Sequence, residues 1–87
     1  MITLDDALIG ITGDPRVSDR GVRLWSLLLA LGAQDRELPV STSDYAQHLN
    51  CSRESIRRAL LNLHAAGWAR LRARSPRVRA VRIEVHR

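Results

Sequence analysis

The sequence predicts a small α+β domain in which three helices precede a C-terminal β-hairpin. Apolar residues recur with the period of a helix between residues 18 and 66, and a period of two begins at Trp68. Capping residues and glycines separate these segments. With 87 residues, of which 45% are hydrophobic, we expect one core and one domain over residues 1–87.

Residues 1–16 are predicted to form an N-terminal arm with little regular structure. Thr3 and Asp6 have the spacing of a capping box, which would support one short helical turn. Gly10 and Gly13 are then expected to break it.

The first main helix is predicted over residues 18–31, from the N-cap Ser18 to the terminator Gly32. Its apolar arc is wide, because Val22, Trp25 and Leu29 extend it past a half-turn. A helix of this kind must be covered on two sides. Together with Leu4, Leu8, Ile9 and Ile11, this surface predicts a homodimer.

Two further helices are predicted close together. Residues 37–41 contain Pro39 and form at most an edge strand. A helix over residues 43–49 is capped by Thr42 or Ser43 and ends at Asn50, and Ser52 caps a helix over residues 53–66. On this last helix Ile56, Ala59, Leu60 and Leu63 share the inner face, whereas Arg57, Arg58 and Leu61 point outward.

The hairpin is predicted over residues 68–85. Ala69, Leu71 and Ala73 alternate with arginines, Ser75-Pro76 marks the turn, and a second alternating run follows. Trp68 is interpreted as a core anchor at the base of the hairpin.

Charge is divided unevenly along the chain. The net charge is +5, all 14 basic residues are arginine, and ten of them lie after residue 50 against only Glu54 and Glu84. Codon bias explains the lack of lysine, but it does not explain this segregation. The segregation indicates a polyanionic partner, because guanidinium groups pair bidentately with phosphate or guanine.

The stretch from Tyr45 to Leu60, YAQHLNCSRESIRRAL, followed by Leu63 and Gly67-Trp68, resembles the bacterial winged helix-turn-helix families. Asp14-Pro15-Arg16-Val17-Ser18 looks like winged-helix domains of plasmid, phage and replication-initiation proteins, so the resemblance covers residues 14–85. It implies that residues 53–66 are the recognition helix and the hairpin is the wing. Many of these families have glycine where Asn50 stands.

The resemblance and the charge pattern predict binding of double-stranded DNA. Residues at the start of the recognition helix would grip a phosphate, Arg57 and Arg58 would reach base edges, and wing arginines would enter the minor groove. The predicted contacts are Thr42, Ser52, Arg53, Ser55, Arg57, Arg58, Arg72, Arg74, Arg77 and Arg79.

No catalytic, metal or cofactor site is predicted. His48 and Cys51 lack further ligands, the lone Cys51 lacks an adjacent base, and no glycine-rich phosphate loop is present. No signal peptide or membrane span is recognised, so we expect a cytoplasmic, nucleoid-associated protein.

Several functions remain open within this fold. A transcriptional regulator is favoured over a plasmid or phage accessory protein for replication, partition or excision. The arginine surface could instead meet an acidic protein partner, or the arginines could be a solvated face that also protects the strand edges. RNA is disfavoured because the sequence offers few aromatic residues for stacking.

Overall fold

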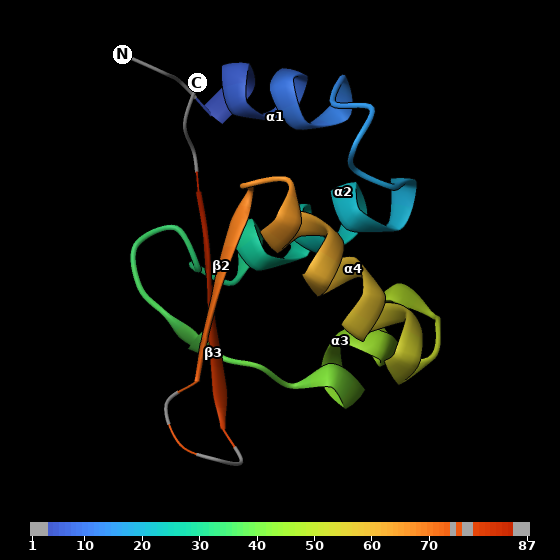
Figure 1. Cartoon of the computed structure of the whole chain (residues 1–87), viewed down its shortest axis with the longest axis vertical. Helices are drawn as coiled ribbons and strands as arrows, with labels where there is room; N and C mark the ends of the chain where they lie inside the picture. The colour runs from blue at the N-terminus through green and yellow to red at the C-terminus, as the bar shows by residue number, and fades with distance from the viewer. Residues whose placement is uncertain (1–3, 74, 76–77, 85–87) are drawn as a thin grey trace.

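A computed structural model describes residues 4–73, 75 and 78–84. The order of its elements is α1 (Leu4–Thr12), α2 (Asp19–Ala30), β1 (Leu38–Pro39), α3 (Thr42–Leu49), α4 (Arg53–Ala65), β2 (Ala69–Ala73) and β3 (Arg79–Ile83). Figure 1 shows α4 lying beside the sheet, with α1 at one end of the molecule and the β2–β3 tip at the other. The α+β winged helix-turn-helix prediction is therefore confirmed.

Serine side chains begin three of the helices. Ser18 accepts a hydrogen bond from the Gly21 N–H, and Ser52 accepts one from the Ser55 N–H, as the sequence predicted. The cap of α3 was predicted one or two residues too late, because Ser41 is the residue that accepts from the Asp44 N–H. Thr42 is instead the first residue of α3.

The N-terminal arm differs from the prediction. It forms a helix of nine residues that runs through Gly10 and packs on the core through Ala7 and Ile11, both fully buried. A Cβ atom at Gly10 would lie 3.0 Å from the Cη2 atom of Trp68. The close approach of α1 to this indole offsets the low helix propensity of glycine.

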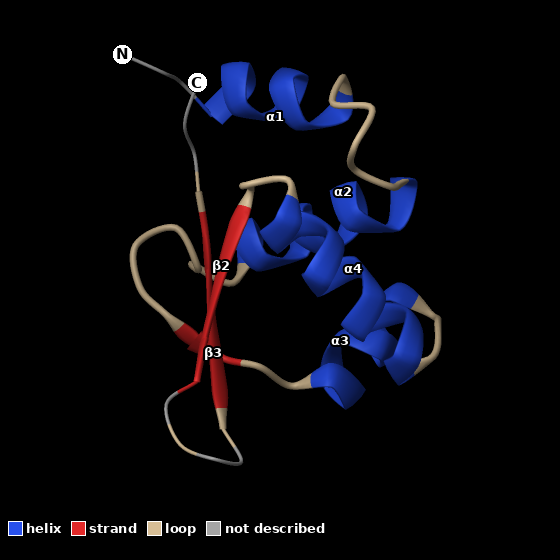
Figure 2. Cartoon of the chain, in the orientation of Figure 1, coloured by secondary structure: helices blue, strands red, loops and turns tan. Residues whose placement is uncertain are grey.

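The sheet has the strand order β1-β3-β2 and is antiparallel throughout (Figure 2). Ala69 faces Ile83 and Ala73 faces Arg79 across the hairpin, whereas β1 pairs Leu38 with Val81 and Pro39 with Ala80. β1 is the edge strand that Pro39 predicted.

Two tryptophans hold the core together. Their rings meet edge to face with centroids 6.0 Å apart, and the Trp25 Nε1 donates a hydrogen bond of 3.0 Å to the Trp68 carbonyl. Trp68 is buried, which confirms its interpretation as a core anchor. Trp25 is buried too, and Val22 and Leu29 pack on the core, so the wide apolar arc of α2 is covered within the chain.

Candidate nucleic-acid interface

The turn between α3 and α4 has the geometry of a helix-turn-helix. Asn50 adopts a left-handed conformation, with φ 53° and ψ 53°, and the Cys51 N–H donates a hydrogen bond of 3.0 Å to the Ala46 carbonyl. Asparagine tolerates this conformation better than most residues, so the turn forms here without a glycine. Buried Ala46 and Leu49 pack α3 against Ile56 of α4.

The start of α4 is internally capped. The Ser52 hydroxyl accepts from the Ser55 N–H at 3.1 Å and donates to the Ser55 hydroxyl at 2.9 Å. The two hydroxyl groups that were predicted to hold a phosphate are therefore engaged with each other. The partial positive charge of the first turn and the exposed Arg53 remain as attractions for an anion.

The outward face of α4 carries two arginines that share one carboxylate. Arg57 Nη1 lies 3.1 Å from Glu54 Oε2, and Arg58 Nε lies 3.7 Å from Glu54 Oε1. The side chains are 61% exposed for Arg57 and 80% for Arg58. Ion pairs this exposed contribute about 0–1 kcal/mol, so either guanidinium can exchange Glu54 for a phosphate or a base at little cost.

The sheet presents its arginines on two opposite faces. Residues paired directly across an antiparallel ladder share a face, so Arg70 lies with Arg82, and Arg79 lies on the other face with Leu71 and Val81. Arg72 shares the face of Arg70. On this reverse face Arg72 donates two hydrogen bonds to Glu37, at 2.9 and 2.6 Å, and Arg70 lies 2.8 Å from Glu84.

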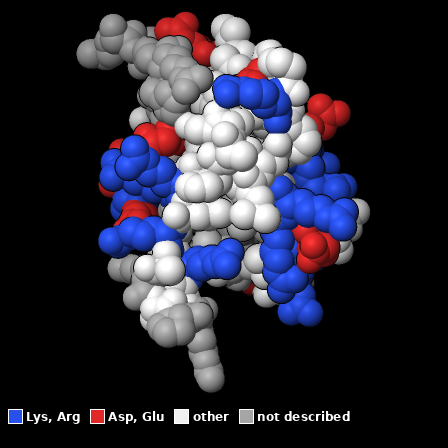
Figure 3. Space-filling view, viewed as in Figure 1, with Lys and Arg blue, Asp and Glu red and all other residues white. Residues whose placement is uncertain are grey.

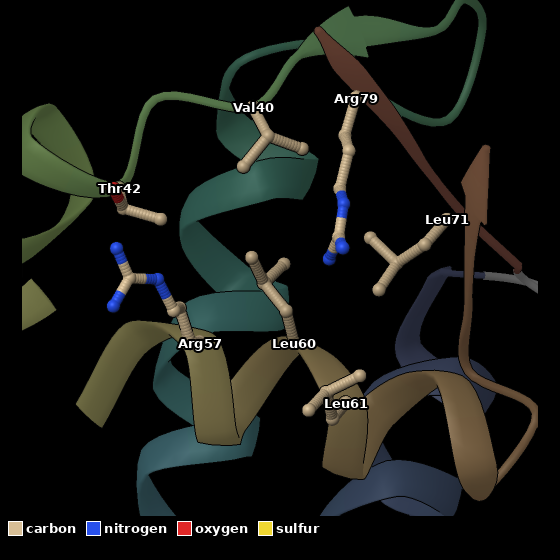
Figure 4. A pocket seen from close by; sticks show the side chains of 7 residues that line it. All are labelled: Val40, Thr42, Arg57, Leu60, Leu61, Leu71 and Arg79. Atoms are coloured by element: carbon tan, nitrogen blue, oxygen red, sulfur yellow. The ribbon is translucent and has the colours of Figure 1, made fainter. Parts of the chain in front are cut away.

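Arg79 lies on the side of the sheet that faces α4. Its side chain forms no ion pair with any residue that the structure describes. Figure 4 shows its guanidinium extending toward α4, between Leu60 and Leu71. Arg79 and the arginines of α4 therefore border the same space.

That space is an open hollow of about 230 Å³ between the start of α3, the middle of α4 and the wing. Arg57 and Thr42 lie close together at one end of it, and Arg79 lies at the other (Figure 4). Its walls are otherwise apolar; its residues are Val40, Thr42, Arg57, Leu60, Leu61, Leu71 and Arg79. In Figure 3 one group of basic side chains lies over the start of α4 and another over the sheet, with uncharged side chains between them.

Apart from Ser52 and Ser55, which are hydrogen-bonded to each other, the predicted contacts separate into three sets. Thr42, Arg57 and Arg79 surround one hollow, and Arg53 and Arg58 continue the same surface along α4. Arg72 lies on the reverse face of the sheet, and Arg74 and Arg77 fall outside the described residues. The apolar walls formed by Val40 and Leu71 were not predicted as part of the site, because they come from segments far apart in the sequence.

The back of α4 is fixed to the loop between α1 and α2. Asn62 Oδ1 accepts a hydrogen bond from the Ser18 N–H at 3.0 Å, and Asn62 Nδ2 donates one of 2.7 Å to the Arg16 carbonyl. In the same loop, hydrogen bonds from Arg16 and from the Trp68 indole hold the pKa of the Asp14 carboxyl well below its usual range. One polar network therefore joins α4, the loop and the base of the wing.

Within the described part of the chain, no three His, Cys, Asp or Glu side chains are grouped as a metal site would require. Nor do the described helices include one long and apolar enough to span a bilayer.

Comparison with protein families gives a match over most of the chain. Residues 22–84, from α2 to the end of the wing, match the model of the Crp-like helix-turn-helix domain. No curated protein and no solved structure gives a significant match. The matched segment contains the whole helix-turn-helix and the wing but not α1. Because the match covers more than half of the chain, this protein belongs to the Crp-like helix-turn-helix family and carries a DNA-binding domain.

Proposed function

We propose that this protein is a small transcriptional regulator that binds double-stranded DNA with α4 in the major groove and the wing against the backbone or the adjacent minor groove. We propose no catalytic role for it. One observation carries the proposal: Arg57 of α4 and Arg79 of β3 border a single hollow, so one duplex can contact both. The sugar-phosphate backbone that separates the major groove from the minor groove would then pass between α4 and the wing.

The charges of this surface support DNA as the partner. Arg53, Arg57, Arg58 and Arg79 are exposed on it, and Glu54 is the one acidic residue of α4. In a plot of the logarithm of the binding constant against the logarithm of the salt concentration, each phosphate that a protein neutralises contributes about −0.9 to the slope. Four arginines therefore give a slope of about −4 per chain.

The test is fluorescence anisotropy with a labelled random-sequence duplex over a series of salt concentrations. We expect binding that weakens with a slope of about −4. A slope near zero, or no binding at micromolar protein and low salt, would contradict the proposal and favour an interaction module for an acidic protein. Selection from random duplexes then identifies the preferred site, and its location in promoters, rather than in origins or attachment sites, is what a regulator requires.

The homodimer stays a prediction, and the exposed apolar surface that supports it is smaller than the sequence indicated. Of the apolar residues that motivated it, Trp25 and Ile11 are fully buried within the chain. Ile9, 71% exposed, remains on the outer face of α1 beside Leu8. Light scattering on a sizing column measures the mass directly, and a monomer both free and on DNA would exclude the dimer.

A further inference from the structure

Leu61 is an exposed apolar side chain in the middle of the cationic surface. It is 56% exposed and borders the hollow together with half-buried Val40 and Leu71. Packing within the chain therefore does not account for a large aliphatic residue at this position. A single exposed leucine is ordinary on a protein surface, but this one borders a hollow whose other walls, Val40, Leu60 and Leu71, are apolar too.

The position of Leu61 relative to Arg57 restricts what could cover it. The two residues are four positions apart, so they lie one above the other on the same face of α4. Figure 4 shows both side chains on the side of α4 that borders the hollow. An occupant must accordingly offer an apolar group to Leu61 between a hydrogen-bond acceptor at Arg57 and a negative charge at Arg79.

A DNA major groove meets this requirement. Its phosphates flank the base edges, and thymine is the base that carries a methyl group on the major-groove edge. Where α4 lies along the groove, a duplex with a base edge at Arg57 also reaches Leu61. The two positions are about 6 Å apart along the helix axis, which is less than two base-pair steps of about 3.4 Å.

We propose that Leu61 is a specificity-determining residue that contacts the 5-methyl group of a thymine within two base pairs of the base contacted by Arg57. This inference rests on the proposed function, because it requires α4 to lie in the major groove. The hollow beside Leu61 gives the methyl group room without displacing Leu60 or Leu71.

The test replaces thymines of the selected duplex with deoxyuridine, one position at a time, which removes the methyl group and keeps the base pair. We expect one position, within two base pairs of the base at which Arg57→Ala relaxes discrimination, to weaken wild-type binding about fourfold. That factor corresponds to about 0.8 kcal/mol for one methyl-sized group removed from water. Leu61→Ala should bind the thymine and deoxyuridine duplexes equally.

Two further variants sharpen the test. Leu61→Gln keeps a side chain of similar length without its apolar branch, so it should also lose the methyl effect. Ile9→Ala truncates an even more exposed apolar side chain, on α1 and outside the lining of the hollow, and should keep the full effect. Thermal unfolding of each variant verifies that the fold is retained.

The outcomes separate this inference from the proposed function. The inference is wrong if wild-type protein tolerates every deoxyuridine, if no thymine lies within the stated window, or if Leu61→Ala keeps the methyl effect. In those cases sequence-specific binding still supports the proposed function, and the hollow receives another occupant, such as a protein segment or a small apolar anion. Failure to bind any duplex would overturn both.

Discussion

The arginines of α4 and the paired arginines on the reverse face of the sheet carry the same charge but differ in their carboxylate partners. Arg57 and Arg58 share the exposed Glu54, four or fewer residues away on the same helix. Arg70 and Arg72 each have a carboxylate of their own, on Glu84 and Glu37, and both carboxylates are about 70% buried. Arg79 lies on the same hairpin as Arg70 and Arg72 but on the opposite face, and no carboxylate that the structure describes pairs with it.

This difference shows that the number of arginines does not identify the DNA-binding surface. A guanidinium that donates two hydrogen bonds to a carboxylate keeps three N–H donors, but the paired carboxylate cancels its charge and repels an approaching phosphate. Whether an arginine of the sheet is available to bind a phosphate therefore depends on the face on which it lies and on its carboxylate partner. We expect the arginines that border α4 to control DNA binding, and the two paired arginines of the reverse face, Arg70 and Arg72, to contribute mainly to the stability of the sheet.

The largest effect is expected from Arg57→Ala. If Arg57 contacts a base edge, its loss should weaken the selected site by about 1–3 kcal/mol and relax discrimination at one position, with less change for random DNA. Anisotropy titrations of both duplexes measure the ratio. Arg23→Ala, at an exposed position on α2, is the control. If Arg57→Ala leaves the ratio of the affinities for the selected and random duplexes unchanged, α4 is not the element that recognises the DNA sequence.

Arg79→Ala should have an intermediate effect of a different kind. A phosphate contact carries no sequence information, so affinity for cognate and random duplexes should fall by similar factors. The log–log salt slope should become shallower by about 0.9. Arg79→Lys retains the charge and should restore the slope. Loss of sequence discrimination in Arg79→Ala would instead make the wing the reader.

The smallest effect on binding is expected from Arg72→Ala, where DNA affinity should change less than about twofold. The variant should lower the free energy of unfolding by about 0.2–1 kcal/mol, because Glu37 loses a bidentate ion pair with Arg72, whose own side chain is 64% exposed. A double-mutant cycle with Glu37→Gln measures the coupling in urea. An effect of Arg72→Ala on DNA as large as that of Arg79→Ala would contradict the distinction between the two faces.

Much of the fold could be predicted because its signals are local. Ser18 and Ser52 begin helices within one turn of their own position, and Asn50 ends α3 through its own backbone conformation. The helix through Gly10 could not be predicted in the same way. Its stability comes from contact with Trp68, which is 58 residues later in the chain.

The site was predictable to a similar degree. Helical spacing placed Arg57 and Leu61 on the outer face of α4, and alternation placed the wing arginines on one or other face of a hairpin. Alternation does not reveal which face turns toward α4, nor that Glu37 comes from β1's side of the sheet to pair with Arg72. These features depend on the register of strands and on three segments meeting at one hollow.

Asn62 is one of the residues that restrain the tilt of α4, because it ties the helix to the loop between α1 and α2. It lies nine residues after Arg53, which is about 13 Å along the helix axis. A tilt of about 5° about this point would move the leading end of α4 by about 1 Å, more than the roughly 0.5 Å within which binding groups must be held. The two hydrogen bonds between one amide and the backbone at Arg16 and Ser18, together with the buried inner face of α4, therefore restrain the direction in which the distant start of the helix points.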